Sequence, residues 1–420
     1  MPRRLNRGLF PATLAGICPS GAQGRTTSIG RGLLMAQYTI NSKYRSIFGM
    51  DVHARSITIK GFDCATGRTK TVKLGNCPVP AEVASWMSAN FEGPIYAAYE
   101  SGCTGFHLCR ELRALGVNCD VIAVSSIPRS VDDKLHKNDK RDAARLLGEL
   151  LNPVSEVSVV WCPDAECEAA RNLTRVRFSA AREAKAAKQR VSALLLTHGY
   201  VWNERTPAGN LKATWTREHK AWISKISLGE PAADEALAFL LERIEEAEAR
   251  VALISKRTLA LAQAPRWKPF VDALCVMKGI DVQTALLLSA AYGDFERFNG
   301  GGAVVKCMGL SPSESSSDES TSRGRIDKAG DAYARYALIE AVQTLSRQTD
   351  APKALRQDQQ IDPSVLKETR AASRRVLSRY LHLIELGKGS NKAKVAAAAE
   401  LARQVWAVGR AVQRAQTAQG

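Results

Sequence analysis

Several features that define special protein classes are absent from this sequence. It contains no run of about 18 uncharged apolar residues, so a helix that spans a membrane is not expected. Its ten cysteines form no C-x-x-C pair and have no histidine at metal-ligand spacing, which argues against a structural zinc site. Most of these cysteines lie in apolar stretches, as reduced cysteines do, and we expect a reducing, cytoplasmic compartment.

Acidic residues are also absent from the first 50 positions, which carry seven Lys and Arg. Residues 321–420 hold 18 Lys and Arg against 9 Asp and Glu, so the two ends supply most of the formal net charge of +17. A basic end on a folded body favours a polyanionic partner, because each neutralised phosphate releases counterions. The alternative is that this charge serves solubility alone.

Residues 1–43 are rich in Arg, Ser, Gly and Pro, and their one short apolar piece is interrupted by Pro11 and Gly16. An acid-free, Arg-rich beginning is typical of a transit peptide. Patterned sequence, however, starts only near Tyr44, and Met35 offers a later start. We therefore interpret residues 1–43 as a disordered or over-extended N-terminus.

Residues 44–155 carry alternating β-rich and helical patterns. Three β-rich runs separated by turn-like residues predict a three-stranded meander, and further strands and helices follow. The expected strands span 45–52, 55–62, 69–74, 95–99 and 120–124, and the expected helices begin near Pro80 and span 104–115 and 139–151. The order β-β-β-α-β-α-β-α is that of a ribonuclease H-like domain, so we expect an α/β fold for this part.

Residues 165–265 predict two long helices around a middle segment rich in Trp, Gly and Pro. Apolar residues of the second helix are spaced 3-4-3-4-3, which is typical of a coiled-coil seam. These are Leu237, Leu240, Ile244, Ala247, Val251 and Ile254, and a less regular stripe on the first helix runs through Leu173, Val176, Ala180, Ala184, Ala187, Val191 and Leu194. We expect an antiparallel helical hairpin that also dimerises, with purely internal pairing as the alternative.

Residues 270–416 predict a third, mostly α-helical domain. Met277-Lys278-Gly279-Ile280 resembles the turn of a helix-hairpin-helix, in which Lys278 and Gly279 would contact a phosphate. Asp281 stands where a second glycine is usual, so a packing turn is an equal alternative. Residues 390–416 predict an Ala-rich basic helix at the surface or in a dimer interface.

Four acids fall at positions that a ribonuclease H-like sheet brings together. Asp51 ends the first expected strand, Glu100 follows the fourth, and Asp139 and Asp142 share one face of the last helix. Clustered carboxylates repel unless cations neutralise them, and ligands that are all oxygen select Mg²⁺ or Mn²⁺. The alternative is that each acid is a solvated cap or turn residue. Two neighbouring acids, Asp132 and Asp133, fit the pattern less well.

A second constellation lies near residue 310. Cys307 to Ser317 reads CMGLSPSESSS, and Gly324 to Asp331 reads GRIDKAGD. A serine-rich run of this kind is by itself typical of a linker.

Together with the four acids, these segments resemble the DEDD transposases of bacterial insertion sequences (insertion sequence 110/1111 and 116/902 type) and the related Piv-like site-specific invertases. The resemblance covers residues 44–414. The family's Gly-Leu-x-Pro is Gly309 to Pro312, its Ser-Ser-Gly is Ser316-Ser317 before Asp318, and its Gly-x-Ile-x-Lys-x-Gly-Asn/Asp is Gly324 to Asp331. Asp318 replaces the motif glycine and would disfavour an approaching phosphate.

The resemblance implies a RuvC-like catalytic domain over 44–155, a coiled-coil linker over 165–265 and a transposase domain over 270–416. It implies that Ser316 or Ser317, with Ser315 less suited, attacks DNA to form a covalent phosphoserine, unless Asp318 impairs this copy. The acids would bind Mg²⁺ or Mn²⁺, and the residues expected to contact phosphate are Arg323, Arg325, Lys328 and Arg335.

The implied partners are double-stranded DNA at the element ends and target, a guide RNA and further copies of the chain in a homodimer or homotetramer. The implied location is the bacterial cytoplasm, at the nucleoid. Two rival functions stay open. One is a RuvC-like junction nuclease that cuts with metal alone, and the other is an inactive nucleic-acid-binding scaffold.

Overall fold

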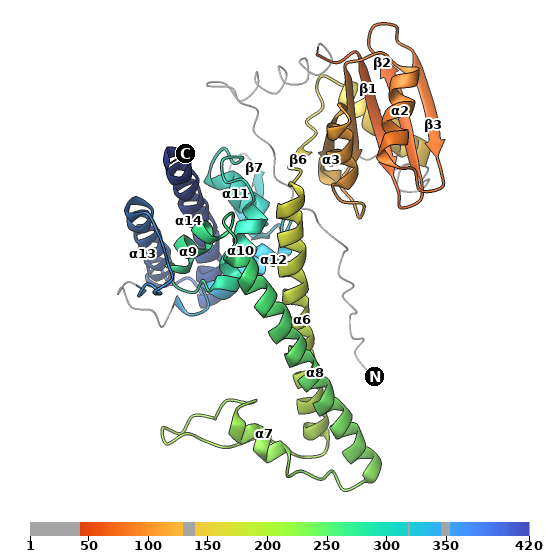
Figure 1. The fold of residues 1–420 in the computed structure, drawn as a ribbon. Coiled ribbons are helices and arrows are strands. Elements are labelled where there is room, and N and C mark those ends of the chain that lie inside the picture. The colour runs from red at the N-terminus through yellow and green to blue at the C-terminus, as the bar shows by residue number, and fades with distance from the viewer. Residues whose placement is uncertain (1–42, 129–138, 318–319, 346–352, 420) are drawn as a thin grey trace. The chain divides into compact units, whose positions relative to one another are not determined.

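The computed structural model describes residues 43–128, 139–317, 320–345 and 353–419. The fold is mixed α/β and mostly helical, with a six-stranded mixed sheet and a two-stranded hairpin (Figure 1). The chain divides into two compact units, one formed by Met1–Glu168 with Pro269–Gly420 and the other by Ala169–Lys268. None of the helices in the described ranges combines the length and apolar character needed to cross a bilayer.

The strands of the large sheet follow the order β3-β2-β1-β4-β5-β6. Strands β1, β2 and β3 form the predicted antiparallel meander, β4 pairs parallel with β1, β5 pairs parallel with β4, and β6 is antiparallel to β5. The strands span Ser46–Val52, Ile57–Asp63, Thr69–Leu74, Ile95–Glu100, Asn118–Ile122 and Val159–Val160, in chain order. The first and fourth strands are therefore neighbours, as predicted.

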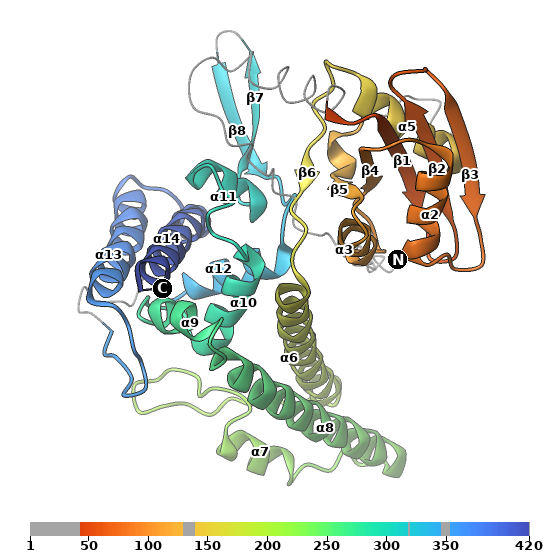
Figure 2. The same cartoon turned by 45° about the horizontal axis from the view of Figure 1, so that its top comes forward.

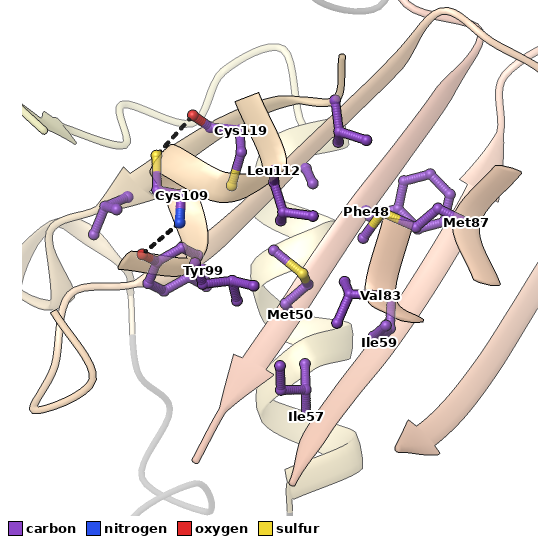
Figure 3. Packing of buried hydrophobic residues seen from close by; sticks show 14 of the residues in the cluster. Phe48, Met50, Ile57, Ile59, Val83, Met87, Tyr99, Cys109, Leu112 and Cys119 are labelled. Atoms are coloured by element: carbon purple, nitrogen blue, oxygen red, sulfur yellow. Dashed lines mark hydrogen bonds between the residues drawn. The ribbon is translucent and has the colours of Figure 1, made fainter. Parts of the chain in front are cut away.

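Helices cover both faces of this sheet. Successive residues of a strand point to opposite faces, so Phe48 and Met50 of β1 join one buried cluster with residues of α2 and α3 (Figure 3). Ile47 joins a second cluster with Leu146 of α5. The helices are α2 (Pro80–Asn90), α3 (His107–Ala114) and α5 (Asp139–Leu151). The α/β expectation for this part is therefore confirmed.

Helix α3 is shorter than the predicted helix over 104–115. It begins at His107 because Gly105 has a φ of +64°, which is outside the helical region. The Tyr99 hydroxyl donates to the Gly105 carbonyl oxygen at 2.9 Å and holds this turn. Gly116, with a φ of +83°, ends the helix. The turn at Gly105, held by Tyr99, therefore decides where the helix starts.

Strand β5 lies two residues earlier than the predicted strand over 120–124. Its register against β4 pairs Asn118 with Tyr96 and Ile122 with Glu100. Residues Val124–Ser126 instead form a short 3-10 helix. Strand β6 was not predicted, because two residues are too few to give a period-two pattern.

The unit Ala169–Lys268 is built on an antiparallel helical hairpin. Its elements are α6 (Ala165–Thr197), α7 (Arg217–Ile223) and α8 (Pro231–Ala262). Lys188 Nζ lies 2.5 Å from Glu248 Oε1, and Arg177 Nε donates to Ser255 Oγ at 3.3 Å. Rising residue numbers on α6 thus meet falling numbers on α8, and the predicted antiparallel pairing is present.

Residues of the predicted coiled-coil seam pack against other residues of the same chain. Leu237 and Ile244 of α8 are buried in one cluster with Val191 of α6. Val176, assigned to the α6 stripe, is 53% exposed, whereas Thr174 is 4% exposed, so that assignment is wrong. Three of the seven residues of the α6 stripe are alanines, and the weak hydrophobic signal of alanine does not fix which residues face inward. Dimerisation through this hairpin stays a prediction.

The C-terminal part contains helices and the small hairpin. Its elements are α9 (Lys268–Cys275), α10 (Val282–Tyr292), α11 (Gly301–Cys307), β7 (Pro312–Ser317), β8 (Ser320–Ile326), α12 (Ala332–Ala341), α13 (Pro363–Glu385) and α14 (Ser390–Gln419). Helix α14 packs on α11, α12 and α13, with Ala397 and Val405 fully buried. Gly409 lies so close to the Phe295 ring that no Cβ fits between them. The helix predicted to lie at the surface or in a dimer interface is therefore packed into the core of this part, and a dimer contact stays a prediction.

Candidate functional site

The first candidate site lies at one edge of the six-stranded sheet. Met50 of β1 pairs with Tyr99 of the parallel strand β4. The next residues, Asp51 and Glu100, therefore follow side by side at the carboxyl ends of neighbouring strands. The exposed fractions of their side chains are 17% and 25%, so both carboxylates are partly shielded from water. The strand register brings these two predicted acids to one edge.

Helix α5 reaches this edge because of a glycine in β1. A Cβ atom at Gly49 would lie 2.6 Å from the Leu147 nitrogen and would strike the Ala143 carbonyl oxygen. Only a residue without a side chain permits this close approach. The first turn of α5 begins at Asp139 and contains Asp142, the residue just before Ala143. The glycine thus positions the helix that carries the other two predicted acids.

Arg145 links an acid of the sheet to an acid of the helix. Its Nη2 lies 3.1 Å from Glu100 Oε1 and 3.0 Å from Asp142 Oδ1. Only 16% of the Arg145 side chain is exposed, so water screens these ion pairs less than it screens surface pairs. The sequence interpretation missed Arg145, although a position three residues after Asp142 places it on the acidic face of the helix.

His53 is a second residue that the sequence interpretation missed. Its Nε2 lies 3.0 Å from Asp51 Oδ2. One residue, Val52, lies between them, and an extended segment places residues i and i+2 on the same side. That spacing is the signal that would have identified the pair.

The donor atoms of this edge suit a hard divalent cation, because carboxylates offer only oxygen. Among the described side chains, no three His, Cys, Asp or Glu gather closely enough to hold a metal ion. The side chain of Asp139 lies outside the described part of the chain, as do Asp132 and Asp133. Arg145 neutralises negative charge between Glu100 and Asp142.

The second candidate site is the serine run, which forms a strand rather than an irregular linker. Ser316 of β7 lies opposite Thr321 of β8, and Ser317 lies opposite Ser320. These serines are therefore beside the turn, and Figure 2 shows the hairpin projecting from α11 and α12. At about 3.3 Å per residue, Ser317 lies roughly 17 Å along the strand from Pro312. The side chains of residues 314–323, among them Ser315, Ser316, Ser317 and Asp318, lie outside the described part.

The Gly-Leu-x-Pro and Gly-x-Ile-x-Lys-x-Gly-Asp motifs pack against each other at the hairpin base. Met308 and Gly330 form a β-bridge. A Cβ at Gly330 would lie 2.6 Å from the Gly309 nitrogen and would strike the Cys307 carbonyl oxygen. The Asp331 nitrogen donates to that oxygen at 3.1 Å, while the Asp331 carboxylate accepts two N–H groups at the start of α12. The two motifs thus anchor the hairpin to a helix.

The predicted phosphate-contacting residues near the hairpin fall into two groups. Arg335 Nη1 donates to the carbonyl oxygens of Met308 and Lys328, both at 3.2 Å, and burial lowers the pKa of Arg335. Arg335 therefore supports the hairpin base. Arg325 and the Lys328 side chain are exposed, whereas the side chain of Arg323 lies outside the described part.

The turn at Gly279 makes contacts that favour the packing alternative. Gly279 has a φ of +83°, and a Cβ there would strike the Ala341 carbonyl oxygen. Asp281 caps α10, because its Oδ1 accepts the Thr284 N–H at 2.8 Å. This carboxylate takes an N–H group that a phosphate at the helix start would use. Phosphate contact by Lys278 and Gly279 stays a prediction.

Comparison with known proteins identifies the family. Residues 271–357, which include the hairpin and its base, match the family described as Transposase IS116/IS110/IS902. The chain is 33% identical over 327 residues to y4qE of Sinorhizobium fredii (strain NBRC 101917 / NGR234), which is named as a candidate transposase, and the match covers 77% of each chain. It is 30% identical over 210 residues to the transposase for insertion sequence element IS1533 of Leptospira borgpetersenii, covering 49% of this chain and 58% of that protein. The chain therefore belongs to the IS116/IS110/IS902 family of transposases.

Proposed function

We propose that this transposase cleaves and rejoins DNA by attack of Ser316 or Ser317, through a covalent phosphoserine, in a reaction that depends on Mg²⁺ or Mn²⁺. The observation that carries the proposal is the hairpin, whose serine-bearing tip rises from a base held by two packed motifs. A linker needs no such base. A fixed base limits where the tip can go, which suits a reactive group that must be aimed.

The proposed step exchanges one phosphoester bond for another. The serine Oγ loses its proton and bonds to phosphorus, one P–O bond of the DNA breaks, and the leaving oxygen takes up a proton. A serine hydroxyl is a weak nucleophile at neutral pH and needs activation. Because the phosphoserine keeps the energy of the broken bond, the hydroxyl of another DNA end can reverse the step and rejoin strands without ATP.

We further propose that the six-stranded sheet with α2, α3 and α5 is a RuvC-like DEDD domain and that α6 and α8 form a coiled-coil linker. The neighbouring ends of β1 and β4 and the approach of α5 support the first assignment. Asp51, Glu100, Asp139 and Asp142 would hold the divalent cation. When bound, that ion supplies positive charge to the attacking and leaving oxygens. His53 orients Asp51 through their hydrogen bond.

The proposed partners are double-stranded DNA at the element ends and target, an element-encoded guide RNA and further copies of the chain. The excess of Lys and Arg in residues 321–420 supports a nucleic-acid partner. The guide RNA and the homodimer or homotetramer rest on the family resemblance.

A trapping assay tests the chemistry. Wild type and the variants Asp51→Ala, Ser316→Ala and Ser317→Ala are incubated with element-end DNA, its flanking RNA and Mg²⁺, and a denaturation-resistant protein–DNA band is sought. Ser313→Ala is the matched control, because Ser313 is exposed at the hairpin base and its hydroxyl donates to the Arg325 carbonyl oxygen.

The expected result is a band that one of the two serine variants and Asp51→Ala lose and that Ser313→Ala keeps. If DNA is nicked without a band and the serine variants behave as wild type, the metal-only junction nuclease is the better account. If wild type binds DNA but neither nicks nor traps it, the chain is a scaffold.

A further inference from the structure

Helix α13 carries a stripe of arginines that nothing on the helix neutralises. Arg370 and Arg374 are four residues apart, as are Arg375 and Arg379, so each pair lies on one helix face. No Asp or Glu stands three or four residues from Arg374, Arg375 or Arg379. Like charges at this spacing destabilise a helix. Repulsion within the stripe therefore lowers the stability of the fold, which indicates that the arginines serve a purpose other than folding.

Arg374, Arg375 and Arg379 line a groove between α13 and α14. The groove has a volume of about 790 Å³ and is lined by Ala371, Arg374, Arg375, Ser378, Arg379, Glu400 and Arg403. Arg403 Nη1 lies 3.1 Å from Glu400 Oε2, and this is the one acid in the lining. Arg374, Arg375 and Arg379 have no ion-pair partner among the described residues and are exposed. The lining therefore carries a net charge of +3.

The two helices that form the groove pack on buried side chains. Val376, Leu377 and Tyr380 of α13 are buried beneath the arginines, and Leu401 and Gln404 of α14 are buried on the other side. Helices α13 and α14 lie side by side along this stretch (Figure 2). Because packed helices hold the backbone of the arginines in place before a ligand binds, less conformational entropy is lost on binding.

We propose that this groove, defined here as the arginine groove, binds the phosphate backbone of double-stranded DNA. Arginine forms paired, charge-assisted hydrogen bonds with phosphate oxygens. The lining contains no aromatic side chain on which an unpaired base could stack, so a duplex backbone fits better than a single strand. The groove lies outside residues 271–357, which match the family, and its lining includes no residue of either candidate catalytic site. The inference rests on the proposed function only for the choice of DNA as the partner.

The test uses the full chain with Arg375→Gln and Arg379→Gln combined. The matched control combines Arg250→Gln and Arg257→Gln, which remove the same charge from exposed positions of α8. Fluorescence anisotropy measures binding to a 30-base-pair DNA duplex (a length of about three helical turns) and to a single-stranded RNA over a range of salt concentrations. We expect the groove variant to bind the duplex about tenfold more weakly and to lower the salt slope, log K against log salt, by about 2.

A lysine version, Arg375→Lys with Arg379→Lys, should keep the salt slope because it keeps the charge. The glutamine variant should be at least as thermally stable as wild type, because it removes a like-charge pair. A wild-type duplex affinity and salt slope in the glutamine variant would overturn the proposal, as would an equal loss in the control. Loss of RNA binding alone would assign the groove to RNA. Since binding is read without strand cleavage, failure of the serine chemistry would leave this result unaffected.

Discussion

The acidic edge of the sheet and the serine hairpin hold their candidate catalytic residues in different ways. At the edge, Asp51 and Glu100 are fixed by neighbouring strands inside a packed domain, and α5 is pressed against Gly49. At the hairpin, the base is held by two packed motifs, and Ser316 and Ser317 lie on β7 close to the turn. The edge suits charges that must stay clustered, and the hairpin suits a group that must reach a bound strand.

The largest effect is expected at Gly49, where the edge depends on close packing. Gly49→Ala pushes a Cβ into the backbone of α5 and should lower the free energy of unfolding by about 3 kcal/mol, measured by urea denaturation. The control is Gly148→Ala in the same helix, where a Cβ meets nothing within 4 Å. That change should raise the free energy of unfolding by roughly 0.5–1 kcal/mol, because Ala favours a helix more than Gly. Equal stability of the two variants would contradict the packing account of this edge.

A smaller effect is expected at Gly330, because it lies at the base of a two-stranded hairpin and not inside a six-stranded sheet packed on both faces. Gly330→Ala should lower the free energy of unfolding by about 2 kcal/mol, because its Cβ strikes the Cys307 carbonyl oxygen. The protein–DNA band should weaken more than duplex binding does, because the tip loses its aim. Gly302→Ala on α11, where a Cβ meets nothing within 4 Å, is the control and should keep the band. A wild-type band in Gly330→Ala would show that the base does not position the tip.

Arg145 tests whether the edge needs a counter-charge when no metal is bound. Arg145→Gln leaves Glu100 and Asp142 without their shared partner and should cost about 1.5 kcal/mol in EDTA, measured as a lower free energy of unfolding. Millimolar Mg²⁺ should restore more stability to this variant than to wild type, because the cation replaces the lost charge. An identical Mg²⁺ response in both proteins would argue against a metal at these carboxylates.

The smallest effect is expected at Asp331, which caps α12 beside the hairpin base. Asp331→Ala removes the side chain that accepts the Tyr333 and Ala334 N–H groups and should cost about 1 kcal/mol. Asp331→Asn should be nearly neutral, because Asn is an equally good cap. Thermal unfolding of the two variants checks this, and a large loss in Asp331→Asn would mean that the negative charge itself is needed.

Much of the acidic edge could be predicted because it follows from local patterns. Alternating apolar residues give the strands, their order makes β1 and β4 neighbours, and two strand ends then carry Asp51 and Glu100. Arg145 was missed because its role appears only when α5 lies against the sheet. The close packing of α5 on Gly49 could not be inferred, since a glycine in a strand does not indicate which backbone it will contact.

The C-terminal part could be predicted less well. The motifs around Gly309 and Gly330 were found, but their packing into a hairpin base depends on contact between segments about 20 residues apart. Helix α14 looked like a surface helix because alanine gives a weak hydrophobic signal, and the basic stripe of α13 was not singled out.

The sequence by itself determined most strands and helices of residues 44–155, the two long helices of residues 165–265, the basic C-terminal third and the family motifs, because each depends on residues close together in the chain. Only the tertiary structure decided which residues meet: Gly49 with α5, Arg145 with Glu100, Gly330 with Cys307, and the arginines of α13 with α14. The physical reason is that close packing and ion pairing act between surfaces. Those surfaces exist only after distant segments of the chain have come together.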